Sequence, residues 1–172
     1  MPVITARREK LKLRSGYISL FFRILLIAAA LYLVFTQLFY VTQVSGMDMY
    51  PAMKDGDLTV VFRLQQDYQK DDIVAYQSDD GIKFGRIAAR GDDVITIDNA
   101  GGWLVNGTEQ SGEILYPTYT QGSLEYPYRV PTDSLFLMGD YRTESIDSRT
   151  YGAIPMDKVI GKVITILRRR SL

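Results

Sequence analysis

One long apolar run lies close to the N-terminus of this chain. Residues 24–44 are 21 mostly apolar residues without a charged side chain. At about 1.5 Å per helical residue they would span roughly 31 Å, which is about the thickness of a membrane's hydrocarbon core. We therefore predict one transmembrane helix over residues 24–44 and a single globular domain over residues 45–172.

The segment before this run is strongly basic. Residues 1–23 carry six cationic side chains against Glu9 alone, which gives +5, and the rest of this neutral chain must carry −5. Nucleic-acid binding is one interpretation of such an arm, but it adjoins an apolar run and has no interleaved aromatic residues. A basic flank instead predicts the cytoplasmic side of a membrane helix. We expect residues 1–23 in the cytoplasm, the helix in plasma-membrane lipid and residues 45–172 outside the cell.

A cleavable signal peptide is the competing interpretation of the first 44 residues. The apolar run is longer than a typical signal-peptide core, and no Ala-x-Ala cleavage site follows it. We therefore favour an uncleaved anchor.

Beyond the apolar run, short β-branched and aromatic runs alternate with turn residues. These runs are residues 59–62, 73–76, 82–88, 94–97, 103–105, 135–137 and 159–167. Asn106-Gly107 favours a hairpin turn because both residues tolerate positive φ, so we expect the run 103–105 to pair with the segment after Glu109. Residues 112–128 show no clear period and predict an irregular excursion. The pattern predicts a mainly β fold, an antiparallel sheet domain behind one N-terminal transmembrane helix.

The sequence contains neither cysteine nor histidine. This absence excludes disulfides and removes the usual general base and the commonest metal ligand, so Ser-His, Cys-His and zinc mechanisms are not available. No segment has the ligand spacing of a calcium loop, and no glycine-rich loop would cradle a phosphate. We expect no metal and no cofactor.

Several short segments carry a more specific pattern. Residues 45–51 read Ser-Gly-Met-Asp-Met-Tyr-Pro, and residues 84–92 read Phe-Gly-Arg-Ile-Ala-Ala-Arg-Gly-Asp. Residues 139–152 read Gly-Asp-Tyr-Arg-Thr-Glu-Ser-Ile-Asp-Ser-Arg-Thr-Tyr-Gly. In this order the segments resemble the type I signal peptidase family, whose last motif is Gly-Asp-Asn-Arg-x-x-Ser-x-Asp-Ser-Arg-x-x-Gly. The resemblance covers most of the chain from residue 37 to 167 and implies a signal peptidase-like fold.

The resemblance also indicates which residues stand at the family's catalytic positions. The family's loop reads Gly-x-Ser-Met-x-Pro-Thr, so Asp48 takes the place of the nucleophilic serine. Alignment on Arg86 puts Gly85 at the place of the catalytic lysine, and counting back from the following Gly-Asp puts Phe84 there. A carboxylate is a weak nucleophile, and its charge would oppose an oxyanion ~4 Å away by about 4 kcal/mol at an effective dielectric of 20. We therefore expect no catalytic residues and a protein that is not an enzyme.

Three other arrangements of residues would supply a catalytic group, and they remain as alternatives. Lys83 would lie on the same face of a strand as Gly85 and would reach toward Asp48, although a salt bridge is the favoured outcome. Asp48 would form an aspartate pair with Asp140 or Asp147, although Asp147 is expected to be committed to Arg149. Ser45 or Ser145 would act with a displaced lysine, which is the least favoured.

The remaining family positions predict a peptide-binding cleft. The predicted cleft or supporting residues are Ser45, Met47, Met49, Lys83, Ser145, Asp147 and Arg149. By resemblance, the serine at 145 supports the lysine position and the Asp147–Arg149 pair braces the loop. Gly85 would leave the cleft floor roomier, and extended peptides would bind by adding a strand to its edge.

The closest resemblance is to signal peptidase-like proteins of Gram-positive pilus loci, some of which lack the catalytic pair. It implies a membrane-anchored accessory factor, a chaperone or docking platform, for the assembly of sortase-linked pili. Pilin subunits or sortase would be its partners, and nucleic acid would not. The alternative is an active membrane-bound signal peptidase with a nonstandard catalytic arrangement.

Overall fold

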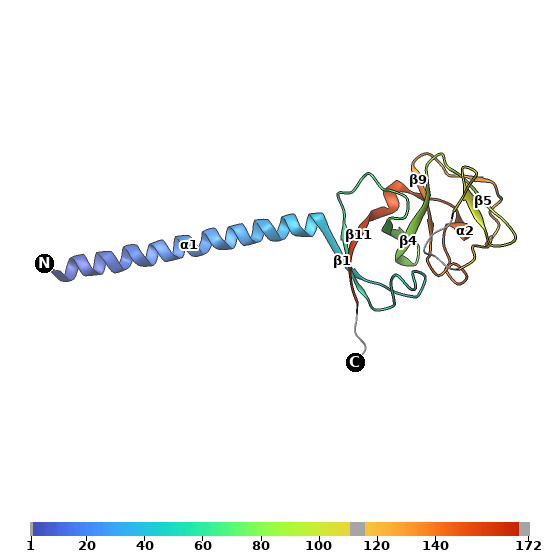
Figure 1. Ribbon diagram of the computed structural model, residues 1–172. Helices are drawn as coiled ribbons and strands as arrows, with labels where there is room; N and C mark the ends of the chain where they lie inside the picture. The colour runs from blue at the N-terminus through green and yellow to red at the C-terminus, as the bar shows by residue number, and fades with distance from the viewer. Residues whose placement is uncertain (1, 111–115, 169–172) are drawn as a thin grey trace. The chain divides into compact units, whose positions relative to one another are not determined.

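The computed structural model describes residues 2–110 and 116–168 (Figure 1). They form two compact units, an N-terminal helix that ends at Leu38 and a β-rich domain that starts at Phe39.

Helix α1 (Pro2–Leu38) makes up the first unit. Its Gly16–Leu38 stretch has 23 residues with a mean hydropathy of 2.4 and is long and apolar enough to cross a membrane. Large apolar side chains such as Leu26, Leu31 and Leu33 are exposed on it. A long helix with large apolar side chains exposed along it is typical of a membrane anchor, so the helix suggests such an anchor.

The helix ends earlier than predicted. The prediction extended it to Val44, but it ends at Leu38 and the next five residues form strand β1 (Phe39–Gln43). Strand β1 pairs with a second strand, Val41 lying opposite Val60. Aromatic and β-branched residues fit either a membrane helix or a strand, and the sheet partner decides between the two. The helix therefore begins before residue 24 and ends at Leu38, inside the predicted span of residues 24–44.

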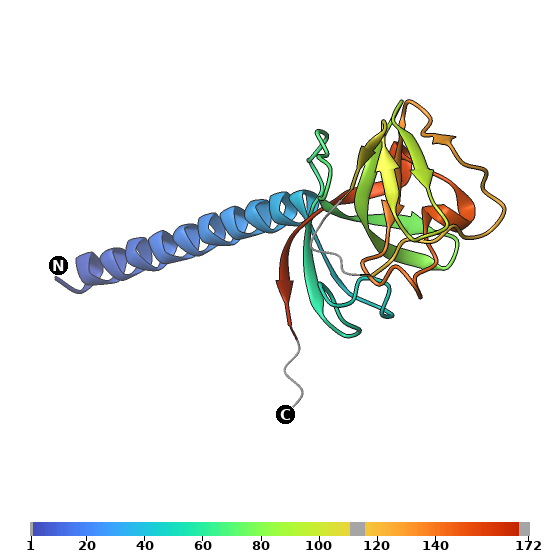
Figure 2. The same ribbon diagram turned by 45° about the vertical axis from the view of Figure 1, so that its right-hand side comes forward.

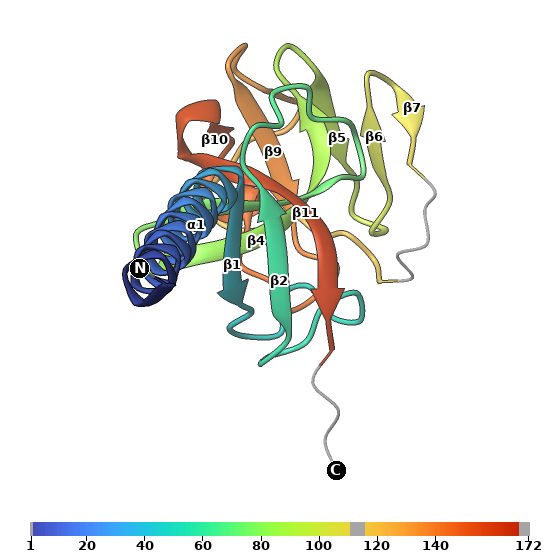
Figure 3. The same ribbon diagram turned by 90° about the vertical axis from the view of Figure 1, so that its left-hand side faces the viewer.

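The larger sheet of the β domain has seven antiparallel strands in the order β1-β2-β11-β3-β4-β9-β10. Its neighbouring strands β1, β2 and β11 lie side by side in Figure 3. Their bounds are β2 Leu58–Phe62, β3 Ile73–Ser78, β4 Gly81–Arg90, β9 Ser134–Met138, β10 Ile154–Pro155 and β11 Val159–Leu167. All five β-branched runs predicted in this region lie within these strands. The predicted mainly β, antiparallel fold is confirmed.

A smaller sheet has four strands in the order β7-β6-β5-β8, and its yellow-green strands are visible in Figure 2. The strands are β5 Val94–Ile97, β6 Trp103–Val105, β7 Thr108–Glu109 and β8 Tyr128–Arg129. The domain also contains two short helices later in the chain, α2 Ser148–Tyr151 and the 3-10 helix η1 Met156–Lys158. Asn106 and Gly107 have φ of 51° and 79°, as the predicted turn requires. Pairing starts at Thr108, immediately after this two-residue turn, and so includes Glu109. Within the predicted irregular segment, residues 111–115 lie outside the described residues.

One buried cluster holds the loop between β1 and β2. It consists of Val44, Met49, Met53, Val61, Ala75 and Phe84. Met53 is fully buried and Met49 is 2% exposed, so two side chains fix this loop to the sheet. Burying one such side chain stabilises a fold by about 1.5–3 kcal/mol. The cluster therefore gives the loop that carries position 48 a fixed conformation.

Gly161 marks a site where β11 passes close to β2. A Cβ at this position would lie 2.2 Å from the Phe62 carbonyl oxygen. Gly161→Ala should lower the free energy of unfolding by about 1–3 kcal/mol, because backbone atoms must shift to relieve the overlap. Denaturant unfolding of the full chain in detergent measures this, with the exposed Ile164→Ala in the same strand as a control expected to change stability by less than about 0.5 kcal/mol. Equal losses in both variants would contradict the close approach.

Candidate functional site

Asp48 lies on the loop that connects β1 to β2, and this loop is tied together at its base. The Val44 amide donates to the carbonyl oxygen of Asp57 at 2.8 Å, and the Gly46 amide donates to the Asp55 carboxylate at 2.9 Å. Gly46 has a φ of +87°, which glycine adopts without strain. The loop therefore presents a half-buried Asp48 in a fixed position.

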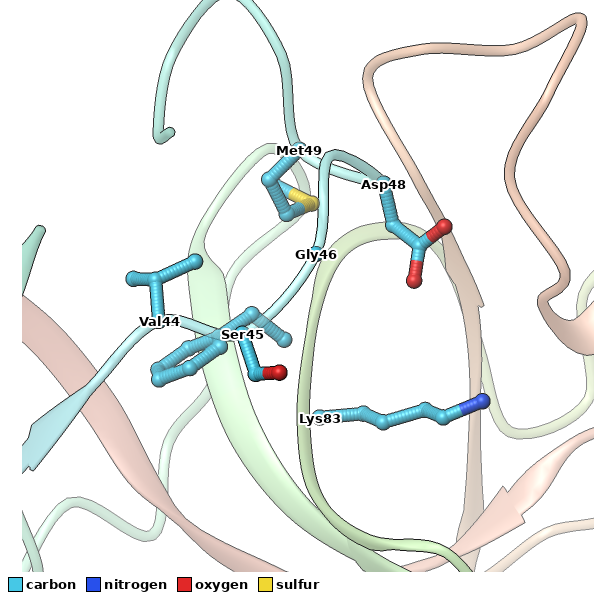
Figure 4. Close-up of a pocket in the computed structure, with 7 residues that line it drawn as sticks. Val44, Ser45, Gly46, Asp48, Met49 and Lys83 are labelled. Atoms are coloured by element: carbon cyan, nitrogen blue, oxygen red, sulfur yellow. The ribbon is translucent and has the colours of Figure 1, made fainter. Parts of the chain in front are cut away.

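A small pocket opens beside Asp48 (Figure 4). Its lining consists of Val44, Ser45, Gly46, Asp48, Met49, Lys83 and Phe84. The Asp48 carboxylate and the Lys83 side chain extend into the same space from the loop and from β4. Five predicted cleft or catalytic-position residues meet here, namely Ser45, Asp48, Met49, Lys83 and the alternative lysine position Phe84. Met47 is not in the lining and is 44% exposed.

The surroundings of the pocket raise the pKa of the Asp48 carboxyl. Burial raises the pKa of the Asp48 carboxyl, and the nearby Asp147 raises it further, while Lys83 and the Ile146 amide N–H lower it by a smaller total. Lys83 forms its ion pair with Asp80, Nζ to Oδ2 3.6 Å, and acts on Asp48 at longer range. The expected salt bridge between Lys83 and Asp48 is therefore not the one that forms, because Lys83 pairs with the exposed Asp80.

Gly85 does not widen the pocket. It is buried in β4, and a Cβ there would lie 2.9 Å from Cβ of Leu137 and 3.6 Å from Cε1 of Tyr76. These two side chains occupy the volume above the glycine. The expectation of a roomier cleft floor at Gly85 is wrong, because neighbouring strands fill the space that the missing side chain leaves.

The segment 139–152 is organised around the buried Asp147. Arg149, which is fully buried, donates Nε and Nη2 to the two oxygens of this carboxylate at 2.9 and 2.8 Å. The Ser145 hydroxyl and the Gly139 amide each donate to Asp147 Oδ2 at 2.9 Å. Asp147 also caps α2 by accepting the Arg149 backbone N–H. The expected Asp147–Arg149 pair is present, and Ser145 belongs to the same cluster.

This segment contacts the Asp48 loop directly. The Tyr141 amide donates to the Asp48 carbonyl oxygen at 2.9 Å, and the Ile146 amide donates to the Asp48 carboxylate. A Cβ on Gly139 would lie 2.6 Å from that same carbonyl oxygen and 2.4 Å from Cβ of Ser145. A glycine at 139 is therefore required for the two motifs to meet.

Arg86 and Asp140 form a second ion pair that the sequence did not assign. Arg86 donates Nε and Nη2 to the Asp140 carboxylate at 2.7 and 2.6 Å, and this two-pronged geometry is strong and specific. Asp140 and Asp147 are both engaged by arginines, so neither is free to share a proton with Asp48. This arrangement disfavours the aspartate pair as a catalytic group.

Sequence reasoning missed a pair of tyrosines near the pocket. The hydroxyl oxygens of Tyr76 and Tyr151 lie 2.6 Å apart, and both interact electrostatically with Asp48 and Asp147. Tyr76 stands on β3 and Tyr151 ends α2. In the sequence Tyr76 was only the last residue of a predicted strand run, which reveals nothing of a partner 75 residues away.

Comparison with known proteins agrees with this geometry. The model of the family "Signal peptidase, peptidase S26" matches residues 16–167. The chain belongs to this family. The family expectation from the sequence motifs is thereby confirmed, and the two loops that meet at Asp48 are those that carried the resemblance.

Named relatives of this S26 family member are peptidases. Signal peptidase I of Bacillus caldolyticus is 27% identical over 144 residues, which cover 70% of this chain and 74% of that protein. Signal peptidase I of Leptolyngbya laminosa is 35% identical over 57 residues, 31% of this chain and 28% of that protein. A crystal structure of a signal peptidase I from Enterococcus faecalis V583 is 26% identical, covers 58% of this chain and 98% of its own, and has a TM-score of 0.46.

The prediction that this protein is not an enzyme is wrong on this finding. The S26 family and both curated relatives are named for a peptidase activity. The prediction was based on the residue types at two positions, Asp48 and Gly85. The family match over residues 16–167 is stronger evidence on this question than the residue types at those two positions.

Asp48→Asn should stabilise the S26 protein at neutral pH. Because burial raises the folded-state pKa of Asp48 above its usual 3.8, the unfolded chain loses this proton first as the pH rises. The free energy of unfolding therefore falls as the pH rises from about 3.8 through the folded-state pKa. Melting temperatures of the full chain and the variant across this range test the effect. A difference that stays constant with pH would contradict it.

Arg149→Ala should lower the free energy of unfolding by about 3–5 kcal/mol, because it leaves the Asp147 carboxylate buried without its cation. Arg129→Ala provides a matched control, since Arg129 and Asp92 form an exposed pair with side chains 71% and 54% accessible. The control should lose at most about 1 kcal/mol. Urea unfolding followed by Trp103 fluorescence measures both. Similar losses would show that the buried network does not hold segment 139–152.

Proposed function

We propose that this chain is a membrane-anchored signal peptidase-like protein whose Asp48 pocket binds an extended polypeptide segment on the outer side of the membrane. The observation that carries the proposal is the convergence of Asp48 and Lys83 on one pocket at the family's nucleophile loop (Figure 4). A polypeptide backbone offers N–H donors to a carboxylate and carbonyl acceptors to an ammonium group. The pocket supplies one of each.

Family membership favours cleavage of the bound segment, by a nonstandard arrangement. Attack by Asp48 itself would form a high-energy anhydride, so its better role is that of a general base. In that role the carboxylate takes a proton from a water molecule as the water oxygen attacks the peptide carbonyl carbon, and it later gives the proton to the departing amine. The raised pKa of Asp48 suits this role, because it brings the carboxyl closer to the working pH. In the same mechanism Lys83 attracts the negative carbonyl oxygen.

A second candidate is an accessory role in the assembly of sortase-linked pili. Asp48 at the position of the family's serine favours it, through the resemblance to signal peptidase-like proteins of pilus loci. In this role the bound polypeptide belongs to a pilin subunit or to sortase. The two candidates share the binding step, and they differ in what happens to the bound chain afterwards.

Photocrosslinking tests the shared binding step. A benzophenone amino acid at position 48 of the full chain, expressed in its own cells, should capture a polypeptide that mass spectrometry identifies as a preprotein, a pilin or a sortase. The control carries the same probe at Glu109, which is exposed on β7 in the smaller sheet. Capture at 48 no greater than capture at 109 would rule out binding at the Asp48 pocket.

A cleavage assay then separates the two candidates. Purified full chain in detergent is incubated with a labelled preprotein, and the products are separated by size. Peptidase action predicts a shortened product that Asp48→Asn reduces at least about a hundredfold, since general acid–base catalysis contributes about 10²–10⁴ in rate. An adduct with pilin or sortase, together with an intact preprotein, would favour the accessory role.

A further inference from the structure

The Tyr76–Tyr151 pair is a polar feature to which the proposed function gives no role. The two hydroxyl oxygens are 2.6 Å apart, which is a short hydrogen bond. Tyr76 is 2% exposed, whereas Tyr151 is 44% exposed. Burial raises the pKa of both hydroxyls, so both remain protonated at physiological pH. The pair therefore joins an enclosed hydroxyl to one that reaches the surface.

A count of protons shows that one of the two O–H donors in this pair lacks a well-placed acceptor among the residues that the structure describes. Two hydroxyls carry two protons, and the bond between them uses one. The other acceptor that the described residues offer is the Ile146 carbonyl oxygen, 3.5 Å from the Tyr151 hydroxyl. That distance is at the outer limit for a hydrogen bond. The exposed Tyr151 hydroxyl is thus able to donate to a better-placed oxygen.

The position of the pair connects it to the peptide site. Tyr76 packs above Gly85, its Cε1 3.6 Å from where a Cβ would stand, and so occupies the volume of a side chain at that position. Tyr151 contacts the carbonyl of Ile146, and the amide of the same residue donates to the Asp48 carboxylate. Asp48 and Tyr151 therefore contact opposite ends of one exposed residue. An acceptor and a donor lie on the same short stretch of surface.

We propose that the Tyr76–Tyr151 hydroxyl pair is a further part of the peptide site, in which Tyr151 donates its O–H to a carbonyl oxygen of the bound polypeptide. In this arrangement Tyr76 donates to the Tyr151 oxygen and so directs the remaining proton outward, which makes Tyr76 a positioning residue. The ligand class is a polypeptide backbone with an unpaired carbonyl next to the group that Asp48 engages. This inference rests on the proposed function, since it names a second contact to the same bound chain.

Binding measurements on hydroxyl-deletion variants test this inference. The probe is a fluorescein-labelled peptide that spans the signal-sequence cleavage region of a secreted preprotein, titrated with full chain in detergent and read by anisotropy. Tyr151→Phe should weaken binding roughly two- to tenfold, the effect of one net hydrogen bond. Tyr76→Phe should weaken it less, and the double variant should match Tyr151→Phe alone, because Tyr76 acts through Tyr151. Tyr119→Phe, at a tyrosine of similar exposure, is the control and should leave binding unchanged.

A spectroscopic reading separates a contact from a structural effect. The NMR signal of the hydroxyl-bearing ring carbon of Tyr151 should shift when the peptide is added to the wild type, and that of Tyr119 should not. Unchanged affinity in both Phe variants together with an unmoved Tyr151 signal would overturn this inference and leave the proposed function intact. Absence of peptide binding by the wild type and of any capture at position 48 would overturn both.

Discussion

The buried carboxylate of Asp147 is the group on which the site's architecture depends. A charge removed from water must be neutralised and hydrogen-bonded, and here Arg149, Ser145 and the Gly139 amide do so. These partners come from the end of β9, the following loop and α2. The hydrogen bonds to this one anion therefore fix three consecutive pieces of chain. Any change that removes one of these partners leaves the Asp147 carboxylate buried without full compensation.

The Asp48 loop takes its position from this anchored segment. Tyr141 and Ile146 lie between the members of the Asp147 cluster, and their amides bind the carbonyl and the carboxylate of Asp48. The contact brings two acidic side chains into electrostatic range, which adds to burial in raising the pKa of Asp48. The same packing that stabilises the domain thus tunes the residue at the family's nucleophile position.

Local patterns in the sequence predicted much of this structure. Short β-branched and aromatic runs located most of the strands, and Asn106-Gly107 located a hairpin, because turn and strand preferences act over few residues. The motif also paired Asp147 with Arg149, two residues apart. Contacts between distant segments were missed, among them the Arg86–Asp140 pair and the Tyr76–Tyr151 pair. The end of α1 at Leu38 was missed as well, since only pairing with β2 distinguishes β1 from more membrane helix.

The space at position 85 shows why a catalytic site cannot be inferred from single letters. A long side chain there would have to displace Leu137, whose Cβ lies 2.9 Å from the required Cβ, and would compete with the Tyr76 ring. Position 85 is therefore coupled to residues on β3 and β9, and Tyr76 in turn is coupled to Tyr151 on α2. Gly85 fits because Leu137 and Tyr76 occupy the space beside it, and Tyr76 carries a hydroxyl group within electrostatic range of Asp48. The chemistry available at this pocket is a property of that whole packed set.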